Sequence, residues 1–130
     1  MNLAYVDTSA LVAIVFGKQG ATATIRELDT LDELFLSNLS DAELKASLVR
    51  EQVSFDLDFQ SWISWVLPDR PFTAEFSRVL AAGYLRGADL WHLACALYLA
   101  DDPKAISFVT LDKQQRAVAR KLGLQVRGAG

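Results

Sequence analysis

Acidic side chains are the main candidates for chemistry in this chain of 130 residues. Against 16 Asp and Glu there is a single histidine, His92, and a single cysteine, Cys95. One cysteine cannot close an internal disulfide, and these two residues cannot build a structural zinc site. Two-histidine ribonuclease chemistry is excluded, and no Gly-x-Ser-x-Gly segment indicates a serine hydrolase. We therefore expect any chemistry to depend on carboxylates and a hard metal ion.

Four of the acids stand where strands are expected to end or helices to begin. These acids are Asp7, Glu43, Asp89 and Asp112. Asp is a favoured N-cap, and acids near a helix N-terminus interact well with the helix dipole. Ser40 and Glu43 also have the spacing of a capping box. Taken singly, each acid is therefore better explained as a helix cap than as a catalytic group.

The hydrophobic pattern predicts short strands alternating with helices. The expected strands are 3–6, 34–36, 106–111 and 124–126, and the expected helices are 8–16, 20–31, 40–50, 90–100 and 113–122. Apolar side chains also recur at helical spacing over 55–66 and 72–84, so the middle of the chain is expected to be helical. The final strand–helix–strand unit is typical of a crossover in a parallel sheet. The length predicts one α/β domain over residues 1–130.

A parallel sheet would bring the four acids together. Its strands direct their C-terminal ends to one edge, where ligand sites form, and both Asp7 and Asp112 follow expected strands. Glu43 lies one turn into a third such unit, and the helix that Asp89 opens could supply the fourth acid. Carboxylates in one crevice repel one another, and a divalent cation would relieve the repulsion. Oxygen ligands without Cys or His suit Mg²⁺ or Mn²⁺, and such sites support in-line displacement at phosphorus.

The basic residues are concentrated toward the C-terminus. Residues 1–65 carry 4 Lys and Arg against 10 Asp and Glu, whereas residues 66–130 carry 9 against 6. The expected last helix contributes four cations, namely Lys113, Arg116, Arg120 and Lys121. Such a cluster indicates contact with a polyanion such as RNA, and a solvated helix face is an equally good interpretation.

Four segments, in order, resemble the motifs of PIN-domain nucleases, and especially the toxins of VapC-type toxin–antitoxin pairs. The segments are YVDTSAL at 5–11, SDAEL at 40–44, GADLWHLA at 87–94 and VTLD at 109–112, the last followed by Ala117, Ala119 and Gly123. The match in order and spacing extends from Asp7 to Val126. The resemblance implies a three-layer α/β/α sandwich with a parallel sheet flanked by helices. It also implies an Mg²⁺-dependent endoribonuclease, with Mn²⁺ as a substitute, that forms a homodimer and is silenced by an antitoxin protein.

The resemblance also assigns roles to single residues. By motif position, Asp7, Glu43, Asp89 and Asp112 form the acidic site, in which the three aspartates hold the metal. Glu43 would orient or deprotonate the attacking water. Ser9 and Thr110 stand where the family often places a supporting hydroxyl. His92 could touch the scissile phosphate, but a packed, hydrogen-bonded role is favoured. Many relatives carry another acid shortly after the fourth motif, where this chain has Gln114 and Gln115, which bears on the number of metals.

Three other interpretations remain open at this point. A phosphoacceptor receiver domain also gathers carboxylates at strand ends, but Lys113, directly after Asp112, fits its pattern poorly. An inactive interaction module would use the carboxylates only as helix caps. A PIN-fold nuclease of RNA processing would share the site without being a toxin. The longest apolar run, 93–100, is too short to span a bilayer, and the N-terminus has no basic start, so a cytoplasmic protein without membrane partners is expected.

Overall fold

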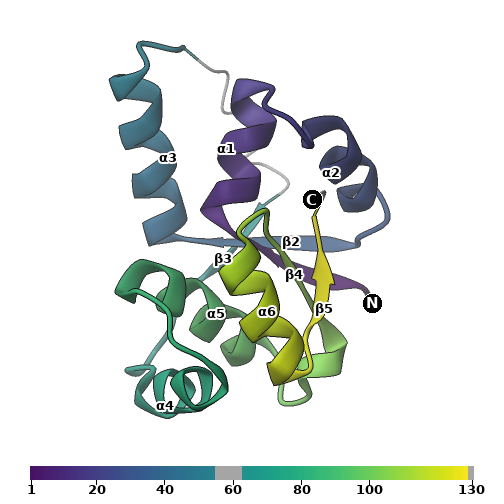
Figure 1. Cartoon of the computed structure of the whole chain (residues 1–130), viewed down its shortest axis with the longest axis vertical. Helices are drawn as coiled ribbons and strands as arrows, with labels where there is room; N and C mark the ends of the chain where they lie inside the picture. The colour runs from purple at the N-terminus through teal and green to yellow at the C-terminus, as the bar shows by residue number, and fades with distance from the viewer. Residues whose placement is uncertain (55–62, 129–130) are drawn as a thin grey trace.

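The computed structural model describes residues 1–54 and 63–128 and contains a five-stranded parallel sheet (Figure 1). The strands are β1 (Leu3–Val6), β2 (Glu33–Ser37), β3 (Ile63–Val66), β4 (Ile106–Val109) and β5 (Gln125–Arg127). Their order across the sheet is β3-β2-β1-β4-β5. The central strand β1 pairs with both β2 and β4, so that Leu3 lies between Glu33 and Ile106. The chain therefore builds outward from β1, first to one side and then to the other.

Within residues 1–54 and 63–128, six α-helices cover the two faces of this sheet. Above the sheet in Figure 1 are α1 (Thr8–Phe16), α2 (Ala21–Leu28) and α3 (Asn38–Arg50), and below it are α4 (Thr73–Ala82), α5 (Gly87–Leu99) and α6 (Lys113–Leu122). A short 3₁₀ turn, Pro103–Ala105, precedes β4. The expected α/β/α sandwich with a parallel sheet is confirmed.

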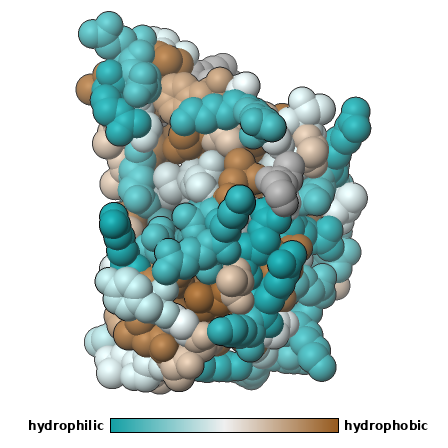
Figure 2. Space-filling view, viewed as in Figure 1, coloured by the Kyte–Doolittle hydropathy of each residue, from teal (hydrophilic) through white to brown (hydrophobic). Residues whose placement is uncertain are grey.

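Each face of the sheet has its own hydrophobic core, because successive side chains of a strand point to opposite faces. In β1, Ala4 and Val6 pack with α1 and α3, whereas Tyr5 packs with α4, α5 and α6. Burial on both faces explains why the strands are short continuous apolar runs. On the face shown in Figure 2, hydrophilic side chains cover much of the surface, with hydrophobic patches between them.

The middle of the chain differs from expectation. Residues Ile63–Val66, expected to end a helix, form strand β3, which pairs with β2 from Leu34 to Ser37. Pairing with a neighbouring strand outweighs a local helical pattern, because β-branched and aromatic residues are well suited to a sheet. The remainder of that expected helix, 55–62, lies outside the described residues.

Helix boundaries also shift in two places that bear on the acids. Helix α3 begins at Asn38 rather than at Ser40, because Ser37 caps it and Ser40 reciprocates. Helix α5 begins at Gly87, so that Asp89 is the third residue of the helix and does not cap it. In contrast, Asp7 and Asp112 cap α1 and α6 as expected.

The strand order creates a crevice at one edge of the sheet. The chain leaves β1 toward β2 on one side and returns to β4 on the other, so the C-terminal ends of β1 and β4 form a topological switch point. A backbone hydrogen bond of 2.8 Å from Asp7 N to Val109 O ties these two ends together. Among the described residues, none of the helices has the length and apolarity to cross a membrane.

Candidate active site

All four predicted acids line one pocket of about 240 Å³ at this switch point. Its described lining consists of Asp7, Thr8, Ser9, Val12, Glu43, Asp89, His92 and Asp112. These residues come from the loops after β1 and β4 and from helices on both faces of the sheet. The structure thus brings together side chains that are up to 105 positions apart, counted from Asp7 to Asp112.

Asp7 is held by hydroxyl donors at the base of the pocket. Its side chain is nearly buried, and Oδ2 accepts hydrogen bonds from Ser9 N at 3.1 Å and Ser9 Oγ at 2.6 Å. Thr110 Oγ1 donates to the same oxygen at 3.2 Å. Ser9 and Thr110 therefore lie where supporting hydroxyls were expected, and both of them orient Asp7.

Gln115 is a site residue that sequence reasoning did not identify as one. It is fully buried, and its Nε2 donates to Asp7 Oδ1 at 3.1 Å. Its Oε1 lies 2.9 Å from Thr110 Oγ1, whose single hydroxyl hydrogen is shared between Gln115 Oε1 and Asp7 Oδ2. Its backbone N–H donates to Asp112 Oδ1 at 2.8 Å. The available signal was the departure from the family pattern at this position, where an amide replaces an acid. An amide donates to Asp7, whereas a carboxylate there would repel it.

Glu43 reaches the pocket from the second turn of α3. Its Oε1 accepts from Thr8 Oγ1 at 2.9 Å and lies 2.7 Å from His92 Nε2. The hydrogen bond from His92 is the main reason that the pKa of Glu43 lies below its ordinary value, and the Thr8 bond adds to the effect. The predicted capping box of Ser40 and Glu43 is wrong, because Ser37 caps α3, which begins at Asn38. Glu43 is therefore a pocket residue without a capping role.

The pKa of Asp89 lies above its ordinary value. Burial raises its pKa most, and the charges of Asp112 and Asp7 raise it further. Glu43 and Asp89 thus have pKa shifts of opposite direction in one pocket. Such a divergence is typical of sites that divide acid, base and ligand roles among carboxylates.

His92 is buried behind Glu43, with 2% of its surface exposed. Its Nδ1 lies 2.6 Å from Tyr5 Oη, and its Nε2 contacts Glu43 as described above. The favoured expectation of a packed, hydrogen-bonded histidine agrees with this geometry. Both ring nitrogens are occupied by protein groups, so the geometry does not favour contact with a substrate phosphate.

The four predicted RNA contacts separate into different environments. Lys113 is exposed as the first residue of α6, next to the pocket residue Asp112. Arg116 donates from Nη2 to two backbone carbonyls, at 3.1 Å to Thr110 and 3.3 Å to Gly128. Arg120 and Lys121 lie in the last turn of α6, roughly 10–12 Å along the helix from its start. Of the four predicted RNA contacts, Lys113 is therefore the exposed cation that lies next to a pocket acid in the chain.

The donor set fits a hard divalent cation. The pocket offers carboxylate and hydroxyl oxygens, and the charges of Asp112 and Asp7 add to the effect of burial in raising the pKa of Asp89. Among the described residues, no three His, Cys, Asp or Glu side chains are arranged so that they could hold a metal ion together. Mg²⁺ usually retains several waters and binds through only one or two carboxylates, so the wider spacing suits an ion held partly through water.

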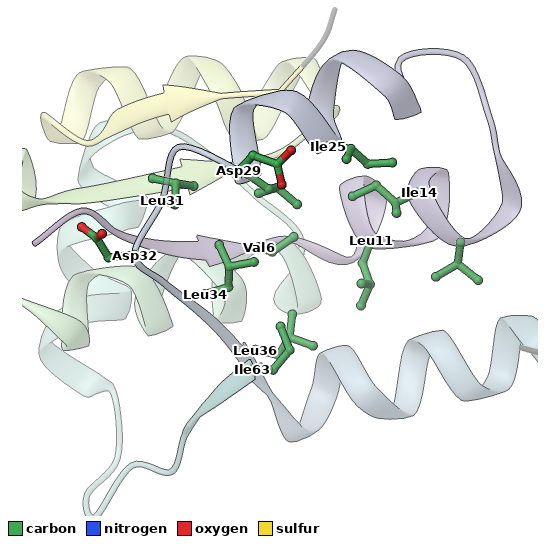
Figure 3. Close-up of a pocket in the computed structure, with 12 residues that line it drawn as sticks. Val6, Leu11, Ile14, Ile25, Asp29, Leu31, Asp32, Leu34, Leu36 and Ile63 are labelled. Atoms are coloured by element: carbon green, nitrogen blue, oxygen red, sulfur yellow. The ribbon is translucent and has the colours of Figure 1, made fainter. Parts of the chain in front are cut away.

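A second pocket, of about 500 Å³, lies between α1, α2 and the strands β2 and β3 (Figure 3). Its lining is almost entirely aliphatic, and Asp29 and Asp32 are its only acidic members among the described residues. Asp32 is already engaged, because its Oδ2 accepts from the N-terminal backbone at Asn2 N. This larger pocket lacks the converging polar groups that chemistry needs, so the smaller acidic pocket is the candidate active site.

Comparison with known proteins agrees with the fold. The family model described as PIN domain matches residues 4–121, and the chain therefore belongs to the PIN-domain family, whose members are generally nucleases. The crystal structure of FitAcB from Neisseria gonorrhoeae is similar, with a TM-score of 0.64 and 17% sequence identity over 95% of this chain and 96% of that chain. At this identity the likeness shows the fold alone. No curated protein sequence matches this chain.

Proposed function

We propose that this protein is a divalent-metal-dependent endoribonuclease that cleaves RNA phosphodiester bonds with an activated water. The convergence of four carboxylates in one pocket at the switch point is the observation that carries the proposal. Membership of a nuclease family supports the same reaction class. We further propose that residues 1–130 act as one nuclease domain in the cytoplasm.

The proposed roles follow from where each acid lies. Asp7 and Asp112 would hold Mg²⁺ or Mn²⁺ directly, and Asp89 would hold waters of the ion. When bound, the metal would acidify a water and stabilise negative charge on the phosphate. Glu43, with its depressed pKa, is an ionised acceptor near pH 7 and would orient or deprotonate that water. Ser9 and Thr110 keep Asp7 in place.

The biological role we propose is that of a toxin in a type II toxin–antitoxin pair. The resemblance of the four motifs to VapC-type toxins carries this part of the proposal. On this interpretation the partners are an RNA substrate, a cognate antitoxin protein and a second copy of the chain. Lys113 is the cation best placed to contact the RNA backbone. A short neighbouring gene that encodes a DNA-binding antitoxin would support the toxin over a nuclease of RNA processing.

Cleavage by purified protein is the direct test. We expect RNA to be cut with Mg²⁺ or Mn²⁺, to survive with a chelator, and to be cut more readily than DNA of the same sequence. Asp7→Asn should lower the rate at least about 100-fold, because it removes a charge at the reacting centre. Asp101→Asn, an identical change at an exposed position away from the pocket, is the matched control.

The same variants separate the nuclease from an inactive module. Divalent metal should raise the Tm of the wild type, and Asp7→Asn should reduce that response while remaining folded. Wild-type protein without nuclease activity and without a thermal response to metal would contradict the proposal. In that case the carboxylates would be explained as helix caps and structural acids.

A further inference from the structure

The buried histidine is the pocket residue whose role the proposed reaction leaves open. His92 lies on α5 one turn after Asp89 and is 2% exposed. A lone histidine in a hydrophobic core is usually a satisfied packing residue. Here, however, one ring nitrogen contacts a carboxylate that opens to the pocket, since the Glu43 side chain is 35% exposed. The ring therefore connects the core to a group proposed to act on water.

The contacts of the ring run in one line across the layers of the fold. Tyr5 Oη, from the central strand, lies 2.6 Å from Nδ1, and Glu43 Oε1, from α3, lies 2.7 Å from Nε2. Thr8 Oγ1 donates to the same Glu43 oxygen at 2.9 Å. Oε1 is thus held from two sides, whereas Oε2 has no hydrogen-bond donor among the described residues.

The chemistry of the partners assigns the direction of these hydrogen bonds. A glutamate carboxyl group is ionised near pH 7 at its ordinary pKa, and an ionised carboxylate only accepts hydrogen bonds. Because Nε2 lies 2.7 Å from Glu43 Oε1, this nitrogen must carry a hydrogen. Burial holds the pKa of Tyr5 far above its ordinary value, so the phenol keeps its proton and can donate it to Nδ1. Trp91 Nε1, which can only donate, donates to Ser37 Oγ at 3.1 Å. Ser37 Oγ lies 2.9 Å from Tyr5 Oη and can donate its own hydrogen to that oxygen, which leaves the phenol hydrogen of Tyr5 for Nδ1.

We propose that His92 is a positioning residue for Glu43. Its Nε2–H, together with Thr8 Oγ1, fixes Oε1 and leaves Oε2 directed to the pocket, where the attacking water would lie. Tyr5 holds the ring in the required tautomer from the other side. The assignment rests on the proposed function in one respect, that Glu43 acts on the water. The histidine itself contacts neither water nor RNA in this scheme.

Two isosteric variants test the assignment. In His92→Gln the side-chain amide can place an N–H where Nε2 was, and so retain the bond to Glu43. In His92→Asn the shorter amide reaches only the position of Nδ1, and so retains the contact with Tyr5 alone. We expect His92→Gln to keep most of kcat, and His92→Asn to lose about 10- to 100-fold in kcat with little change in KM, as for other groups that orient a reacting residue.

Both variants disturb the same core, so stability and activity must be measured on each. Equal losses of kcat in the two variants, or none in either, would overturn the proposal, since the role would then be packing alone. A second measurement does not depend on catalysis. The ¹³C NMR signal of the Glu43 carboxyl carbon, assigned with Glu43→Gln in protein without added metal, should stay in place in His92→Gln and move in His92→Asn. A signal that moves equally in both variants would also overturn the proposal.

The two measurements keep this inference separate from the proposed function. Wild-type protein that cuts no RNA would refute the nuclease. The NMR comparison would still decide whether the histidine holds the carboxylate of Glu43. Conversely, an active wild type with equally active His92 variants would leave the nuclease intact and refute the positioning role.

Discussion

The carboxylate of Asp7 both caps helix α1 and lines the acidic pocket. Its Oδ2 caps α1 through Ser9 N, while Oδ1 accepts a hydrogen bond from Gln115 Nε2 and lies 3.9 Å from His92 Nε2. Asp112 likewise caps α6. For these two acids, capping and metal binding are compatible, because the cap uses Oδ2 of Asp7 and Oδ1 of Asp112 and leaves the other oxygen of each carboxylate outside the cap. Glu43 and Asp89 do not cap their helices, so capping alone does not explain why four acids meet.

Asp89→Asn tests the repulsion among the acids. The raised pKa means that the folded protein binds this proton more tightly than the unfolded chain, so ionised Asp89 costs stability at pH 7. Measured by thermal melts with a chelator present, the variant should be more stable than the wild type at pH 7. The gain should be below about 4 °C, since a partly exposed group contributes about 1 kcal/mol at most.

Most carboxylates in folded proteins have lowered pKa values and stabilise the fold when ionised, whereas ionised Asp89, with its raised pKa, is expected to destabilise it. The gain should shrink as the pH falls toward the ordinary pKa of Asp, because the wild-type side chain is then neutral too. A variant that is less stable at pH 7 would show that Asp89 is favourably paired instead.

The Gln115→Glu variant tests whether the uncharged amide of Gln115 avoids repulsion between a carboxylate at this position and Asp7. The variant places a second carboxylate 3.1 Å from Asp7 Oδ1, in a fully buried position. Without metal we expect a loss of about 2–4 kcal/mol in the free energy of unfolding, from the lost hydrogen bond and the added repulsion. With Mg²⁺ the Tm of the variant should rise more than that of the wild type.

The neighbouring residue provides the control. Gln114→Glu makes the same substitution at an exposed position, where the amide donates to Tyr84 O at 3.0 Å, and we expect a loss below about 1.5 kcal/mol. Urea unfolding with and without Mg²⁺ gives the free energy of unfolding of the wild type and of the two variants. Similar losses at 114 and 115 would mean that the amide has no particular relation to the acidic pocket.

At the scale of elements, hydrogen bonds between the ends of β1, β4 and β5 fix the backbone beside the acidic pocket. Thr110 N donates to Arg127 O at 3.0 Å, and Arg116 bonds the carbonyls of both Thr110 and Gly128. Thr110 in turn donates to Asp7. The C-terminal strand, which contributes no acid, thus supports an acid at the end of β1.

Gly128→Ala tests this support. Gly128 has a φ of +125°, and a Cβ there would lie 2.1 Å from Thr110 O, so the backbone must move. We expect a loss of about 1–3 kcal/mol or more in the free energy of unfolding. The matched variant, Gly87→Ala, meets nothing within 4 Å and should cause no loss. Chemical denaturation followed by circular dichroism measures both, and equal stability of the two variants would contradict the close contact.

At the scale of the whole molecule, one sheet is shared by two hydrophobic cores, and the pocket lies where the two layers meet. Leu44 is buried in the α1–α3 core and Leu93 in the α4–α6 core. Glu43 comes from the first layer and His92 from the second. The site therefore exists only when both layers are packed on the sheet.

Core substitutions test whether the layers unfold together. Leu44→Ala and Leu93→Ala should each lower the free energy of unfolding by about 2–5 kcal/mol. In both variants tryptophan fluorescence and far-UV circular dichroism should report one coincident transition, because the layers share β1. Two separated transitions in either variant would show that the layers are independent units.

Much of this architecture could be predicted from local sequence. Helices α1 and α6 begin and end at the expected residues, because an N-cap Asp and a left-handed glycine mark their ends. Strand β3 could not be predicted, since Ile63–Val66 also fits a helical stripe and only β2 alongside makes it a strand. The sequence predicts that α3 starts at Ser40 rather than at Asn38, because Ser37 and Ser40 are both of a residue type that caps helices.

The identity of the four acids and their order along the chain are properties of the sequence alone, as is the scarcity of His and Cys. Only the tertiary structure decides that Glu43 is held by His92 and Asp7 by Gln115, because these bonds join residues 49 and 108 positions apart. Sequence patterns report the conformation of neighbouring residues, through caps, turns and periodicity. Contacts across the sheet depend on which layers pack together, and that is decided by the burial of both faces at once.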